Sequence, residues 1–105
     1  MKEIGADEFQ KITSGSTVLV DFGAEWCGPC KAMLPVLDRF SKEFTGRVEV
    51  RSVDIDKSPE LAAQHGVMSV PTLMLFKGGR IVERIVGALS ERDLRKKLEP
   101  HLGVA

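Results

Sequence analysis

The sequence is poor in the residues that build metal sites, because its 105 residues include two cysteines and two histidines. It also lacks an excess of charge of either sign, since fifteen basic residues balance fifteen acidic ones. Without a net charge there is no global field to gather nucleic acid or an anionic membrane surface. The start, MKEIGADEFQ, has acidic residues where a signal peptide needs an apolar run, and nothing later approaches a membrane span. We therefore expect a cytoplasmic protein that binds neither nucleic acid nor membrane.

The length predicts a single domain over residues 1–105. A chain of this size buries roughly 65% of its unfolded surface, which is enough for a core without cross-links. The hydrophobic share of 43% and the charged share of 29% are those of an ordinary globular protein. The sequence shows no internal repeat, no low-complexity tract and no linker.

Hydrophobic periodicity and turn residues predict helices that alternate with strands. A helix is expected at 6–13 and another after the cysteine pair, where the apolar stripe is interrupted at Pro35. Two further helices are expected at 58–66 and from Ser90 onward. The predicted strands are 17–24, 47–55, 72–76 and 80–86. This order gives an α/β fold with a central mixed sheet flanked by helices on both faces.

Cys27 and Cys30 are separated by a Gly and a Pro in EWCGPCK, residues 25–31, and three interpretations compete for the pair. A structural disulfide closing so short a loop would contribute only about 2 kcal/mol. The spacing is also half of a zinc site, but there is no second cysteine pair, and His65 and His101 lie on different predicted helices. The third interpretation is a reversible dithiol/disulfide switch, which the spacing favours over the other two.

The position of the pair suits redox chemistry. Cys27 lies where a strand ends and a helix begins, so unpaired backbone N–H groups and the helix dipole favour its thiolate. A sulfur of low pKa is also a good leaving group. Cys30 lies one helical turn further on, close enough to attack a mixed disulfide formed at Cys27.

Asp21 interrupts the apolar run VLVDF six residues before the first cysteine. Burying a carboxylate without a partner is costly and raises its pKa. Such a group below the cysteines could accept the proton from Cys30 as that residue attacks. The local pattern is equally compatible with a solvated aspartate at a strand edge.

Several motifs occur in the order and spacing of one known family. They are VDFGAEWCGPCK at residues 20–31, Pro35 in the next helix, VPTLMLFKGG at 70–79 and VGALS at 86–90. Over essentially the whole chain these motifs resemble the thioredoxin family. The resemblance implies the thioredoxin fold, with Cys27 as attacking thiol, Cys30 as resolving thiol and Asp21 as a buried acid that shuttles the proton.

The resemblance also implies a cis peptide bond before Pro71 and an apolar docking surface around the reactive sulfur. The residues that match this surface are Trp26, Gly28, Pro29, Val70, Pro71, Gly87 and Ala88. It further implies that the protein reduces disulfides in partner proteins and is itself re-reduced by an NADPH-dependent thioredoxin reductase. We expect a monomer that binds no cofactor. Its redox-active group is the Cys27–Cys30 disulfide itself. Two alternatives are an isomerase or oxidant on the same fold, and a thioredoxin-like binding or regulatory subunit.

Two positions depart from the family pattern. Gly23 stands where many members carry an aromatic residue, and Ser52 stands where many carry a lysine near the buried acid. Without that cation, we expect the pKa of Asp21 to rise further. Elsewhere we expect the methionines at 33, 68 and 74 to fill the core, and His101 to be solvated.

Overall fold

The computed structural model describes residues 1–103, which form five strands, four α-helices and a final 3-10 helix. In chain order the elements are β1 (Lys2–Glu3), α1 (Ala6–Gly15), β2 (Thr17–Gly23), α2 (Gly28–Glu43), β3 (Glu49–Asp54), α3 (Pro59–Gln64), β4 (Thr72–Lys77), β5 (Arg80–Val86), α4 (Glu91–Leu98) and η1 (Glu99–Leu102). The sequence predicts every α-helix and every strand except β1. That strand carries no hydrophobic signal, because it has two residues and both are exposed.

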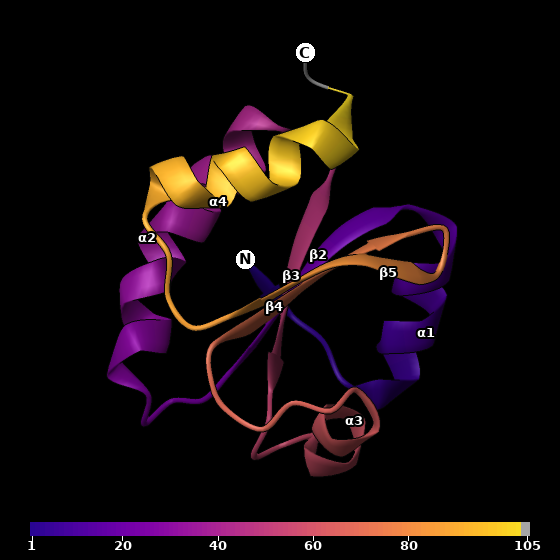
Figure 1. Ribbon diagram of the computed structural model, residues 1–105. Coiled ribbons are helices and arrows are strands. Elements are labelled where there is room, and N and C mark those ends of the chain that lie inside the picture. The colour runs from indigo at the N-terminus through magenta and orange to yellow at the C-terminus, as the bar shows by residue number, and fades with distance from the viewer. Residues whose placement is uncertain (104–105) are drawn as a thin grey trace.

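The strands form one mixed sheet in the order β1-β3-β2-β4-β5. β1, β3 and β2 run parallel, whereas β4 pairs antiparallel with both β2 and β5. β2 is therefore the central strand, which explains why its sequence is apolar on both faces apart from Asp21. Helices lie on both sides of this sheet, as Figure 1 shows, and the predicted α/β fold class is confirmed.

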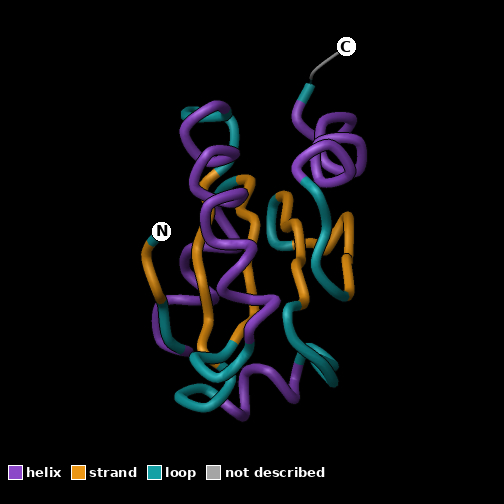
Figure 2. Tube along the Cα trace, turned by 90° about the vertical axis from the view of Figure 1, so that its left-hand side faces the viewer, coloured by secondary structure: helices purple, strands orange, loops and turns teal. Residues whose placement is uncertain are grey.

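Each face of the sheet carries its own cluster of buried side chains. α2 and α4 cover one face, and α1 and α3 cover the other (Figure 1). In Figure 2, α2 lies in front of the sheet and runs along the strands. Leu19 belongs to the cluster under α2, whereas Val20 and Phe22 belong to the cluster under α1 and α3. Since side chains alternate along a strand, Asp21 lies on the α2 face.

α2 passes through Pro35 without ending there, so the expected interruption is wrong. Proline removes one helical hydrogen bond and crowds the preceding turn. Met33 and Leu37 on either side of it are buried in the same core cluster, and this packing keeps the helix continuous. Among the helices described in residues 1–103, none is long and apolar enough to cross a bilayer, α2 included.

Two side chains are placed differently from the expectation. Met33 and Met74 are buried, but Met68 is 97% exposed in the segment between α3 and β4. Methionine as a residue type predicts burial. Met68, however, lies between α3 and β4, in a segment without helix or strand that would turn its side chain toward the core. His101 is partly buried rather than solvated, with Nε2 3.2 Å from Oε2 of Glu83 on β5.

Candidate active site

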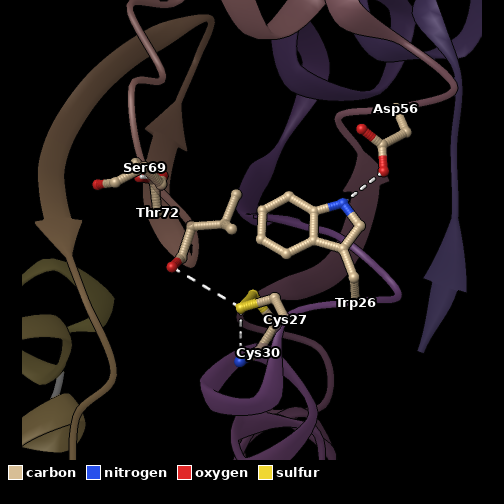
Figure 3. Close-up of a disulfide and its surroundings, with 7 residues drawn as sticks. Trp26, Cys27, Cys30, Asp56, Ser69 and Thr72 are labelled. Atoms are coloured by element: carbon tan, nitrogen blue, oxygen red, sulfur yellow. Dashed lines mark hydrogen bonds between the residues drawn. A yellow bond between two sulfur atoms is a disulfide. The ribbon is translucent and has the colours of Figure 1, made fainter.

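Cys27 and Cys30 form a disulfide at the start of α2. Cys27 is the N-cap residue, and Pro29 occupies the first turn, where its missing N–H costs nothing. The backbone N–H of Cys30 donates to Sγ of Cys27 at 3.1 Å (Figure 3). This donor and the positive end of the helix dipole stabilise a negative charge on the Cys27 sulfur once the disulfide is reduced.

Sγ of Cys27 faces the loop before β4, 3.8 Å from the carbonyl oxygen of Val70 (Figure 3). The Val70–Pro71 peptide bond is cis, which is the conformation that the resemblance implies. The backbone N–H of Gly87 donates to the carbonyl oxygen of Pro71 at 2.8 Å. Gly87 has φ of +95°, in the left-handed region that favours glycine. The Cys27 sulfur thus lies against the loop before β4, and the same loop is hydrogen-bonded to Gly87 after β5.

The seven residues expected to form a docking surface differ in exposure. Trp26, Gly28, Pro29 and Ala88 are exposed, Val70 and Gly87 are partly buried, and Pro71 is buried. The indole of Trp26 is 67% exposed, and its Nε1 donates to Oδ2 of Asp56 at 2.7 Å (Figure 3). Sequence reasoning missed Asp56, because nothing local connects it to a tryptophan thirty residues earlier. This hydrogen bond fixes an otherwise free ring beside the sulfur.

Asp21 is 3% exposed, so the interpretation as a solvated aspartate is wrong. It lies on β2 opposite Ser52 of β3. Burial raises the pKa of Asp21 to about 6, because the carboxylate form loses its hydration. Its Oδ1 is buried and has no hydrogen-bond partner within the part of the chain that the structure describes. A carboxyl group of this pKa exchanges protons readily near neutral pH.

One pocket joins Asp21 to Cys30. It has a volume of about 820 Å³, and both residues line it together with Gly23 and Ser52. A Cβ placed on Gly23 would lie 3.5 Å from Sγ of Cys30 and 3.9 Å from Oδ1 of Asp21. The space in front of Gly23 therefore borders both the sulfur and the carboxyl oxygen.

Burial alone does not distinguish the two sulfurs, since Cys27 is 4% exposed and Cys30 is 5% exposed. Their surroundings do. Sγ of Cys27 faces the carbonyl of Val70, whereas Sγ of Cys30 faces the Asp21 pocket. Sγ of Cys27 thus borders the loop before β4, whereas Sγ of Cys30 borders the space next to the Asp21 carboxyl group.

The geometry defines a class of protein: one that exchanges a dithiol for a disulfide at the N-terminus of a helix. The pair spans a four-residue segment, so the cross-link adds little to stability. Within residues 1–103 no group of three or more His, Cys, Asp and Glu side chains is arranged to hold a metal ion.

Comparisons with known proteins agree with this class. The sequence model of the thioredoxin family matches residues 1–100. Thioredoxin 1 of Nostoc sp. is 45% identical over 91 residues, which cover 87% of this chain and 85% of the relative. Thioredoxin of Staphylococcus aureus is 41% identical over 102 residues, 97% of each chain. A solved structure of Plasmodium falciparum thioredoxin superposes with a TM-score of 0.89 at 34% identity, covering 96% of this chain and 99% of that one.

The chain belongs to the thioredoxin family. It is a thiol–disulfide oxidoreductase that reduces protein disulfides through the Cys27–Cys30 pair. Membership of this family implies disulfide-containing protein substrates and, as is usual for it, a thioredoxin reductase as electron donor. The alternatives of a binding subunit or of an isomerase are not favoured.

Proposed function

We propose that Cys27 is the attacking thiol and Cys30 the resolving thiol of this reductase. The observation that carries the assignment is the opposite surroundings of the two sulfurs. Cys27 is the N-cap of α2, receives the N–H of Cys30 and faces the exposed docking residues. Cys30 faces the pocket that contains the buried carboxyl group.

The reaction transfers two electrons from the dithiol to a disulfide. The Cys27 thiolate attacks one sulfur of the substrate disulfide, so a mixed disulfide forms and the other substrate sulfur leaves as a thiolate that takes a proton. The Cys30 thiol then loses its proton and attacks Sγ of Cys27. The Cys27–Cys30 disulfide forms, and the second substrate sulfur leaves as a thiol once it is protonated.

Asp21 acts as the base that accepts the proton of Cys30, through water in the pocket. Its carboxyl group lines the same pocket as that sulfur and has a pKa of about 6, so it is ionised at neutral pH. The substrate segment docks on the exposed surface around Cys27. There the backbone of Val70 offers hydrogen-bonding groups, and Trp26, Pro29 and Ala88 offer apolar contact.

The oxidised protein returns to the dithiol by reaction with a thioredoxin reductase that draws on NADPH. We place this cycle in the cytoplasm, where reducing conditions keep thiols available. The protein acts as a monomer, because a partner copy over Trp26 or Ala88 would cover the surface that the substrate needs. No bound cofactor takes part, since the electrons reside on the two sulfurs.

The test is to trap the mixed disulfide. Cys30→Ser removes the resolving thiol, so the protein should remain covalently attached to a substrate such as insulin, and multiple turnover should fall by at least about 10³-fold. Cys27→Ser is the matched control, because it keeps one thiol at the same site and should trap nothing. Mass spectrometry of the trapped species identifies the linked cysteine.

Equal trapping by the two variants would contradict the assignment of roles. Trapping by Cys27→Ser alone would reverse it. Because both variants keep the shape of the docking surface, loss of docking does not produce either pattern. An analytical ultracentrifugation run on the oxidised protein checks the monomer separately.

A further inference from the structure

Met33 on α2 is a buried core residue that also makes a polar contact. Its side chain is 1% exposed, in the cluster between α2 and the sheet. Its Sδ accepts the backbone N–H of Leu89 at 3.4 Å, across 56 positions of the chain. A thioether sulfur is a weak acceptor, but the side chain of a leucine of similar size offers no acceptor at all. The hydrogen bond therefore gives Met33 a role that filling the core does not require.

The donor of this hydrogen bond lies where the chain leaves the sheet. Leu89 is located between β5, which ends at Val86, and α4, which begins at Glu91. Its side chain is partly buried and packs against the same cluster as Met33. A backbone N–H in such a position needs an acceptor, because losing its hydration without one costs free energy. The sulfur of Met33 supplies that acceptor from α2.

The segment that contains Leu89 is held at a second point. The N–H of Gly87 donates to the carbonyl oxygen of Pro71 at 2.8 Å. Pro71 follows Val70, whose carbonyl oxygen is 3.8 Å from Sγ of Cys27. The segment after β5 is thus tied to the loop before β4 at one end and to α2 at the other.

These contacts form a closed ring that includes the disulfide. α2 begins at the disulfide, and Met33 lies on its second turn. From Met33 the ring passes to Leu89 and Gly87, then to the loop before β4, where Val70 contacts the sulfur of Cys27. The segment between β5 and α4 has no helix or strand structure of its own. Its position therefore depends on these two hydrogen bonds more than that of α2 or the sheet does.

We propose that Met33 is a positioning residue for substrate docking. Its sulfur fixes the segment of residues 87–89 against α2, and with it Ala88, an exposed residue of the proposed docking surface. A segment that is already held in place loses less conformational freedom when a substrate binds to it, so affinity is higher. The inference rests on the proposed docking surface, but not on the roles of the two cysteines.

Met33→Leu tests the proposal, because it nearly keeps the volume of the buried side chain and removes the acceptor. Amide hydrogen exchange of the oxidised, isotope-labelled protein reports on the hydrogen bond directly. We expect the Leu89 amide to exchange at least about three-fold faster in this variant. In steady-state reduction of insulin, with dithiothreitol as the electron donor, KM should rise at least about three-fold, and kcat should change less than about 1.5-fold.

Met74→Leu is the matched control for the substitution. Met74 is 0% exposed on β4, in the cluster under α1 and α3 on the other face of the sheet. The same change there should leave both the exchange of the Leu89 amide and KM as they are in the wild type. Ala88→Glu is the control for the docking surface. It places a charge at an exposed position that docking would desolvate, so it should raise KM at least about three-fold.

Unchanged exchange of the Leu89 amide in Met33→Leu would overturn the proposal, and so would an equal effect of Met74→Leu. A fall in kcat with KM unchanged would also overturn it, since a docking contact acts on KM. If Ala88→Glu raises KM and Met33→Leu does not, the docking surface stands and the role of Met33 is wrong. If neither variant changes KM, the docking surface itself is wrong, and this inference fails with it.

Discussion

The two sides of the Cys27–Cys30 disulfide are built in opposite ways. On the Cys27 side, the loop before β4 brings the backbone carbonyl of Val70 to the sulfur, and the exposed Trp26 precedes Cys27 in the chain. On the Cys30 side, the central strands β2 and β3 present one buried carboxyl group and the small residues around it. The Cys27 side thus offers exposed surface and a backbone group, whereas the Cys30 side offers one titratable group, the carboxyl of Asp21.

This difference separates two requirements of the reaction. A reductase that accepts many substrates needs a docking side that recognises the backbone and apolar surface of a disulfide segment rather than particular side chains. Proton transfer needs a group of fixed position and suitable pKa, which only a rigid strand provides. Substitutions on the Asp21 side should therefore change pH dependence, and those on the Trp26 side should change substrate affinity.

The largest expected effect is that of Asp21 on the stability of the folded protein. The pKa of Asp21 is about 6 in the folded protein against an ordinary value of 3.8. The folded state thus holds the proton more tightly, so ionisation of Asp21 lowers stability as pH rises from about 4 through 6. Relative to Asp21→Asn, the wild-type protein should lose about 2–3 kcal/mol of unfolding free energy between pH 4 and pH 8.

Urea unfolding of both oxidised proteins at pH 4 and at pH 8 measures this difference. Because the amide does not titrate, its own burial cost is the same at both pH values and cancels. Asp38→Asn serves as the control, since its exposed carboxylate should give a difference near zero. A pH-independent difference between wild type and Asp21→Asn would show that Asp21 has an ordinary pKa.

A smaller effect on the same side concerns the rate of the resolving step. In Asp21→Asn, water must accept the proton of Cys30, and release of the mixed disulfide should slow at least about ten-fold at pH 7. Attack by Cys27 precedes this transfer and should keep its rate. Stopped-flow fluorescence of Trp26 with a model disulfide separates the two phases. Equal slowing of both phases would assign Asp21 a structural role instead.

Much of this contrast was predictable from the sequence, but unequally for the two sides. The strand pattern around Asp21 indicated a carboxyl group in an apolar run, and the family resemblance chose burial over solvent. The docking side depends on contacts between distant segments. No local pattern connects Trp26 to Asp56 or Gly87 to Pro71, so those hydrogen bonds required the folded chain.

The expectations that were wrong also failed because tertiary contacts cannot be seen in a local pattern. Pro35 has the local chemistry of a helix breaker, yet burial of the residues around it keeps α2 intact. Met68 has the character of a core residue, yet the segment that carries it leaves it exposed. In each case tertiary packing, or its absence, overrides the preference of the residue. The pocket at Gly23 was not predicted, because it is lined by four separate segments that no local pattern connects.

The smallest effect is expected on the docking side, where Trp26→Phe keeps an apolar ring but removes the hydrogen bond to Asp56. An exposed hydrogen bond of this kind contributes roughly 1 kcal/mol, so kcat/KM for a protein disulfide should fall only about three- to five-fold. If Trp26 belongs to the docking surface, as proposed, the loss should appear in KM, because a docking contact takes no part in bond making. Asp56→Asn still offers an acceptor to the indole and should change KM less than Trp26→Phe. Steady-state reduction of insulin by both variants, with their pH profiles, completes the comparison. An unchanged pH profile with a raised KM assigns this side to docking, whereas a shifted profile would break the division between the two sides of the disulfide.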